Sequence, residues 1–90
     1  MSKNWFVYMI ETKCGALYTG ITTDVERRYA EHLAVKEGGR LGAKYFRGRE
    51  PKRVVLVESF DDRSAASKRE YEIKAMARKQ KLALISAGKT

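Results

Sequence analysis

The segment Trp5–Ile10 is apolar at all six positions and rich in aromatic and β-branched side chains. Such a run favours a strand that is covered on both faces, because a strand with one face in water alternates apolar and polar residues. The segment Leu17–Thr22 also has a strand-forming composition, and the six residues between the two contain a glycine, which suits a hairpin. We therefore predict a β-hairpin in which a turn centred on Lys13 places Tyr8 about opposite Tyr18.

The first helix is predicted to follow the hairpin directly. Thr23 and Glu26 have the spacing of a capping box, in which the Thr oxygen caps the helix and the Glu reaches back to the cap. The helix is expected to span about residues 24–35 and to end before two consecutive glycines. Residues 38–53 hold the only proline and six basic side chains, and this composition predicts a loop.

A third strand and a second long helix complete the predicted core. Val54–Val57 is apolar and β-branched, and the acidic pair Asp61-Asp62 followed by Ser64 can cap a helix over about residues 63–78. Residues 82–85 are predicted to form a last helical turn or short helix that packs back on the core. The resulting fold class is α/β (α+β): one domain over residues 1–90, with a small three-stranded, mainly antiparallel sheet flanked by helices.

The charge balance points to a polyanionic partner. Nineteen Lys and Arg face eleven Asp and Glu, a formal net charge of +8. A basic domain attracts nucleic acid, although a generic basic surface that only keeps the protein soluble is the alternative. Cys14 is the single cysteine, which excludes an internal disulfide and suits a reducing compartment. The six-residue apolar run is too short for a secretory or membrane-spanning segment, so a cytoplasmic protein without membrane association is expected.

Two strand tyrosines and a glycine are candidate site residues. Tyr8 and Tyr18 lie in apolar segments, where tyrosine is also a common packing residue. Gly20 interrupts the second strand without a turn partner. A glycine there is typical of a bulge or of a close approach to the backbone, and a plain strand end is the alternative.

The first helix adds a cation and an imidazole. Arg28 and His32 are four residues apart and therefore share a face. Val25, Tyr29 and Leu33 are expected to form the adjacent buried stripe, which places Arg28 and His32 at its edge. Taken singly, either one is also consistent with an ordinary solvated or hydrogen-bonded side chain.

A carboxylate interrupts the apolar stripe of the second helix. Ala66, Glu70, Ile73 and Ala77 follow helical spacing, whereas Glu72 falls on another face. Burying an unpaired carboxylate is costly, so Glu70 is expected either to pair with an arginine at the boundary of the core or to bind a metal ion.

Together these residues resemble the GIY-YIG nuclease domain, and most closely its small stand-alone bacterial members. The resemblance rests on Val7-Tyr8-Met9, on Tyr18-Thr19-Gly20 ten residues later, and on the helical Arg28, His32 and Glu70. It covers residues 4 to about 78. The first triplet lacks the family's glycine, Leu33 stands where an Asn is frequent after the histidine, and residues 82–90 supply no C-terminal Asn.

The resemblance implies roles for these residues in phosphodiester hydrolysis. Glu70 is implied as the ligand of Mg²⁺ (or Mn²⁺), a cation that takes oxygen ligands and keeps several waters. Arg28 offers a planar fork that matches phosphate oxygens. Tyr18 or Tyr8 would deprotonate the attacking water, and His32 would polarise a tyrosine or relay its proton.

Basic side chains in the predicted loop and first helix are the candidate nucleic-acid contacts. Cations give affinity for the phosphate backbone without reading sequence, and the neighbouring Tyr45 and Phe46 could stack on bases. A solvated loop with both aromatic rings in the core is the alternative. The residues chosen as nucleic-acid-binding are Arg27, Lys44, Arg47, Arg49, Lys52 and Arg53.

The function predicted from the sequence is that of a Mg²⁺-dependent nuclease of low intrinsic sequence specificity, with DNA favoured over RNA and a role in DNA repair or processing. The alternative from another class is a non-catalytic nucleic-acid-binding module in which the same site only grips phosphate. A third hypothesis is a DNA-repair accessory protein that depends on a partner protein for targeting.

Overall fold

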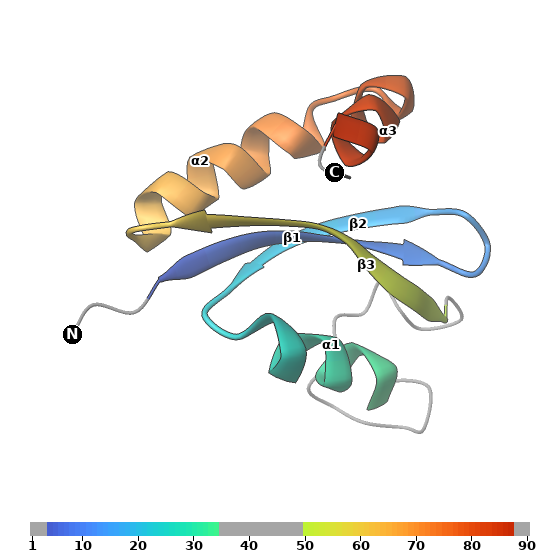
Figure 1. Ribbon diagram of the computed structural model, residues 1–90, viewed down its shortest axis with the longest axis horizontal. Coiled ribbons are helices and arrows are strands. Elements are labelled where there is room, and N and C mark those ends of the chain that lie inside the picture. Colours follow the sequence, from blue (N-terminus) through green and yellow to red (C-terminus); the bar gives the residue numbers. More distant parts are fainter. Residues whose placement is uncertain (1–3, 35–49, 88–90) are drawn as a thin grey trace.

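The computed structural model describes residues 4–34 and 50–87, which form a three-stranded sheet with three helices (Figure 1). The order β-β-α-β-α-α confirms the predicted α+β class. The elements are β1 (Trp5–Thr12), β2 (Leu17–Thr22), α1 (Val25–Ala34), β3 (Pro51–Phe60), α2 (Arg63–Lys74) and α3 (Arg78–Ala87).

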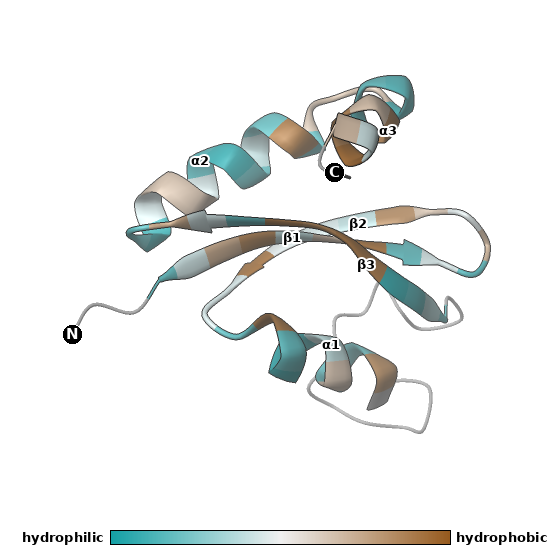
Figure 2. Ribbon diagram, in the orientation of Figure 1, coloured by the Kyte–Doolittle hydropathy of each residue, from teal (hydrophilic) through white to brown (hydrophobic). Residues whose placement is uncertain are grey.

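The sheet is antiparallel with the order β2-β1-β3, so β1 is the central strand. Its four residues Val7–Ile10 are all buried, because α1 lies on one face of the sheet and α2 and α3 lie on the other (Figure 1). The prediction of a strand covered on both faces is confirmed. The hydropathy colouring shows the same division, with an apolar centre of the sheet and a largely hydrophilic α2 (Figure 2).

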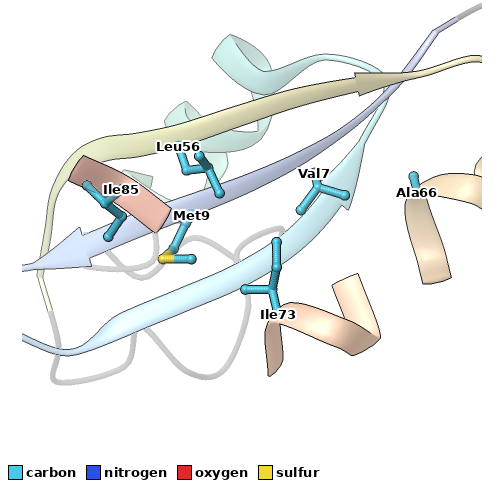
Figure 3. Close-up of a cluster of buried hydrophobic side chains, with 6 residues drawn as sticks. All are labelled: Val7, Met9, Leu56, Ala66, Ile73 and Ile85. Carbon is cyan, nitrogen blue, oxygen red and sulfur yellow. The ribbon is translucent and has the colours of Figure 1, made fainter. Parts of the chain in front are cut away.

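The main core lies between the sheet and the α2–α3 layer. Figure 3 shows side chains from four elements, β1, β3, α2 and α3, converging there: Val7, Met9, Leu56, Ala66, Ile73 and Ile85. Ile85 comes from α3, which confirms that the C-terminal segment packs back on the core. A second, smaller cluster around Tyr8 and Ile10 lies on the α1 face, with Tyr18, Val25, Tyr29 and Val54 packed against it.

The hairpin register differs from the prediction. Tyr8 pairs with Gly20, and Tyr18 pairs with Ile10. The turn is shifted because the backbone N–H of Thr12 donates to the carbonyl of Ala16 at 2.9 Å, and Gly15 adopts a left-handed φ of +87°. The partner of each residue moves by two positions, and since side chains alternate with a period of two, Tyr8 and Tyr18 still share a face.

The first helix, Val25–Ala34, lies within the predicted range of about residues 24–35 but has a different cap. Its start is capped by Asp24, whose carboxylate Oδ1 accepts from the backbone N–H of Arg27 at 3.0 Å, so the prediction of Thr23 as N-cap was wrong. The predicted burial of Leu33 was also wrong: this side chain is 41% exposed, whereas the neighbouring His32 is fully buried. The buried face of α1 is therefore rotated toward His32, whose imidazole has a hydrogen-bond partner, Tyr8, in the core.

The second helix begins as predicted and ends earlier. The Asp62 carboxylate accepts from the N–H of Ala65 at 2.8 Å and caps α2. The helix ends at Lys74 instead of continuing to residue 78, because the chain turns at Ala75 so that α3 can bring Ile85 to the core. Among the helices in residues 4–34 and 50–87, none is long and apolar enough to cross a membrane.

The third strand is longer than predicted, since it includes Pro51–Arg53 from the predicted loop. These residues pair with the end of β1, where Arg53 Nε donates to Glu11 Oε1 at 3.0 Å. Residues 38–49 of the predicted loop, and with them the positions chosen at Lys44, Arg47 and Arg49, lie outside the described residues.

Candidate active site

The α1 face of the sheet holds a tyrosine pressed against a glycine. A Cβ atom added at Gly20 would lie 2.7 Å from the Tyr8 hydroxyl oxygen and 2.8 Å from the ring carbon that carries it. Real Cβ atoms do not approach so closely, and only glycine leaves room for the phenol to cross β2. The close approach predicted for Gly20 has its physical cause here: the bare backbone lets Tyr8 reach toward α1.

Tyr8 meets His32 beneath the surface. The hydroxyl oxygen and the imidazole Nε2 share a hydrogen bond of 2.8 Å, and the two residues are 1% and 0% exposed. The ring of Tyr18 joins them, with its centroid 6.1 Å from that of Tyr8 and 5.3 Å from that of His32. Three side chains from β1, β2 and α1 thus form one packed aromatic cluster.

Burial sets the protonation of this cluster. Burial, assisted by the nearby charge of Arg28, lowers the pKa of His32 to about 4, against the opposing effect of Glu31. The imidazole is therefore neutral at pH 7. Burial and the neighbouring Tyr18 raise the pKa of Tyr8 well above its ordinary value, although a hydrogen bond and the charge from Arg28 oppose the shift. Tyr8 thus carries its proton at neutral pH.

Arg28 places a permanent cation at the rim of the cluster. Its Nη1 donates to Glu31 Oε1 at 2.8 Å, one turn further along α1. Partial burial opposes the charge, but the bonds to Glu31 and Tyr8 outweigh it and raise the pKa of the guanidinium. Glu31 was not among the residues predicted from the sequence. Its position three residues after Arg28, on the same face, is the signal that could have identified it.

The cluster has an inner and an outer layer. Tyr8 and His32 are buried, whereas Tyr18 is half-buried and the Arg28 side chain is 28% exposed. A substrate that approaches from solvent would therefore meet Tyr18 and Arg28, with Tyr8 and His32 supporting them from below.

Glu70 lies in a different layer of the fold. It projects from α2, which packs on the face of the sheet opposite to α1 (Figure 1), and its carboxylate is 3.3 Å from Lys74 Nζ. Its side chain is 23% exposed, which matches the predicted half-buried position between Ala66 and Ile73. Among the described residues Arg28 pairs with Glu31, and Glu70 pairs with Lys74 instead of the expected arginine, so the metal-binding role of Glu70 stays a prediction.

The candidate metal ligand Glu70 lies on the face of the sheet opposite to the tyrosine cluster. Within the described residues no three His, Cys, Asp or Glu side chains converge. Thr19, however, shares the face of the sheet with Met9, against α2, and its Oγ1 is buried with no hydrogen-bond partner in that part of the chain. The carboxylate of Glu70 is a hard oxygen donor and suits Mg²⁺, which needs few protein ligands because it keeps its own waters.

The predicted nucleic-acid contacts are dispersed where the structure describes them. Arg27 is exposed on α1, and Lys52 is exposed at the start of β3. Arg53 is engaged by Glu11, as described above. The basic side chains that begin α3 were missed; the signal for them was a run of cations without acids in the last part of the chain.

The fold and the α1-face cluster together define a class of protein. A Tyr from each strand of the first hairpin, a glycine under one ring, and an Arg and a His from the next helix are the features of a GIY-YIG domain. The sequence matches the GIY-YIG catalytic domain over residues 4–83, and the chain belongs to this family, whose members are generally nucleases that bind nucleic acid and typically use a divalent metal ion.

Relatives of similar size occur in archaea and bacteria. UPF0213 protein HQ_3675A of Haloquadratum walsbyi is 49% identical over 88 residues, which is 98% of this chain and 93% of the relative. UPF0213 protein VNG_2274C of Halobacterium salinarum is 54% identical over 87% of this chain and 95% of its own length. The solution NMR structure of UPF0213 protein BH0048 from Bacillus halodurans is similar with a TM-score of 0.59 and 44% identity, over 94% of this chain and 85% of that one.

Proposed function

We propose that this chain is a Mg²⁺-dependent nuclease that hydrolyses phosphodiester bonds in DNA with low intrinsic sequence specificity, in DNA repair or processing. The observation that carries the proposal is the packed set of Tyr8, Tyr18 and His32 with Arg28 at its rim. A domain that only gripped phosphate would have no need for a buried Tyr–His pair beneath the cation.

Arg28 is proposed to bind the scissile phosphate. Its guanidinium is a fixed cation, partly exposed, and held by Glu31 so that little side-chain freedom is lost on binding. Negative charge grows on the phosphate oxygens as water attacks, and a preorganised cation stabilises that charge more than it stabilises the ground state.

Tyr18 is proposed as the group that accepts the proton of the attacking water. It is the outer, half-buried tyrosine of the cluster, so it is the tyrosine that a water from solvent would meet. The water oxygen then forms a bond to phosphorus, and the bond to the leaving oxygen breaks. Tyr8, which keeps its own proton, and the neutral His32 hold the ring of Tyr18 in place by packing against it.

Glu70 is proposed to hold the metal ion, because its partly exposed carboxylate can bind Mg²⁺ together with waters. When bound, Mg²⁺ would supply Lewis acidity at this carboxylate. Lys74 would have to release Glu70, which an ion pair of a partly exposed lysine allows at little cost.

The low sequence specificity in the proposal rests on the charge pattern. The chain carries a net charge of +8, and phosphate contacts of this kind position a nucleic acid without reading its bases.

A cleavage panel tests the proposal. Single-stranded, duplex and branched DNA and RNA are incubated with the protein and Mg²⁺, Mn²⁺ or excess chelator. The proposal expects cleavage of DNA that depends on the metal ion. Binding without cleavage of any substrate would contradict it and would favour a non-catalytic binding module.

A further inference from the structure

A second concentration of positive charge lies away from the tyrosine cluster. From residue 73 to the end the chain carries five Lys and Arg and no Asp or Glu. Three of these cations, Arg78, Lys79 and Lys81, fall in the first turn of α3. We refer to these three residues as the α3 basic surface.

The charges of the α3 basic surface are not used in ion pairs within the described part of the chain. Arg78 and Lys79 are exposed, and within residues 4–34 and 50–87 none of the three cations takes part in an ion pair. Cations in the first turn of a helix are also disfavoured by the helix macrodipole, which favours acids there. Positive charge that is not used in such ion pairs indicates a negatively charged partner outside the fold.

The surface continues onto the hairpin. The Nη2 atom of Arg78 is 3.9 Å from where a Cβ of Gly15 would be, so the guanidinium lies along the turn that also carries Lys13. The Lys13 side chain is 61% exposed, although Glu50 pairs with it. The α3 basic surface is thus a rigid patch built on a helix and next to a turn, on the side of the sheet opposite to α1 (Figure 1).

We propose that the α3 basic surface binds the phosphate backbone of a nucleic acid, as a second contact region in addition to the tyrosine cluster. The kind of partner follows from the side chains. Arg78, Lys79 and the adjacent Gln80 are all polar, and long cationic side chains suit repeated phosphates. Specific protein–protein interfaces usually contain aromatic anchor residues, and the first turn of α3 has no aromatic side chain.

Two contact regions on opposite sides of the sheet imply a large substrate. A nucleic acid bound at both would pass around the end of the molecule that carries the hairpin, so the substrate class is an extended or branched nucleic acid. The inference rests on the nucleic-acid binding in the proposed function but is independent of cleavage.

The test compares two double variants that remove the same charge. Arg78→Gln with Lys79→Gln alters the α3 basic surface, and Arg63→Gln with Lys68→Gln removes two exposed cations from the first half of α2. Binding to a duplex of about 20 base pairs is measured without metal ion by fluorescence anisotropy, between about 50 and 200 mM NaCl. Circular dichroism checks that both variants are folded.

The expected result is a change in salt dependence that is specific to one variant. Each lost phosphate contact reduces the slope of log K against log salt by about 0.9, so the Arg78/Lys79 variant should lose about 1.8 and the Arg63/Lys68 variant much less. Equal slopes in the two variants, an unchanged slope for Arg78/Lys79, or no binding by the unaltered protein would overturn the inference. Binding that shows the expected slopes without any cleavage would contradict only the proposed nuclease activity.

Discussion

Replacing Gly20 with alanine should damage the fold at the tyrosine cluster. The new Cβ would lie 2.7 Å from the Tyr8 hydroxyl oxygen and 2.8 Å from the adjacent ring carbon. Ordinary carbon contacts are about 3.5–4.0 Å, so the phenol must move by roughly 0.8 Å or more. The ring is 1% exposed and bonded to His32, and this movement would stretch or break the 2.8 Å hydrogen bond.

The cost of Gly20→Ala can be estimated from these two effects. Overpacking a well-packed site costs about 1–3 kcal/mol, and leaving a buried hydrogen-bonding group without its partner costs about 1–3 kcal/mol. Removing a glycine from a strand offsets about 0.5–1 kcal/mol. The free energy of unfolding should therefore fall by about 2–4 kcal/mol, which lowers Tm by roughly 10–20 °C for a domain of this size.

Urea unfolding of two pairs of proteins measures the effect. Gly20→Ala is introduced into the unaltered chain and into a Tyr8→Leu background, where the side chain that the Cβ would meet is absent. In the second background the substitution should cost less than about 1 kcal/mol. An unchanged free energy of unfolding with Tyr8 in place, or the same loss in both backgrounds, would refute the reasoning.

Three further results are expected from the same cluster. Burial lowers the pKa of His32 from 6.5 to about 4 in the folded chain, so as pH falls the unfolded chain binds the proton at a higher pH than the folded chain does. The free energy of unfolding should fall by about 3 kcal/mol as pH drops from about 6.5 to 4, and urea titrations should show this slope reduced in His32→Gln. Arg28→Ala should reduce the cleavage rate by about 10²–10³ with the fold intact by circular dichroism, so normal turnover would remove Arg28 from the site. Glu31→Gln removes the partner that holds the guanidinium and should raise KM for nucleic acid more than it lowers kcat; an NMR titration should also show a lower pKa for His32, and an unchanged pKa would contradict the contact.

Most of the architecture could be predicted from local patterns. The apolar run in β1 predicted a strand covered on both faces, and Asp62 was identified among the residues able to cap α2. The end of α2 could not be predicted, because Ala75-Met76-Ala77 has a composition that favours continued helix. The tertiary contact of Ile85 with the core decides the break, and no local pattern reports it.

The candidate site was predicted by residue type and not by geometry. The shift in hairpin register depends on the bonds of Thr12 and the φ of Gly15, which the strand pattern does not contain. The burial of His32 in place of Leu33 depends on the Tyr8 hydroxyl, a partner from another strand. The spacing of apolar residues alone favoured the burial of Leu33, because such a pattern does not take account of a buried, hydrogen-bonded polar pair.

The role of Glu70 provides the most direct test of the proposed metal-dependent hydrolysis. Cleavage of DNA is measured for the unaltered chain, for Glu70→Gln and for the exposed control Glu72→Gln over a range of Mg²⁺ concentrations. Both substitutions keep the shape of the side chain and remove one negative charge. Glu70→Gln should abolish metal-dependent cleavage with little change in unfolding free energy or metal-free DNA binding, and Glu72→Gln should cut normally. Normal cleavage by Glu70→Gln, or full activity of the unaltered chain in excess chelator, would contradict it.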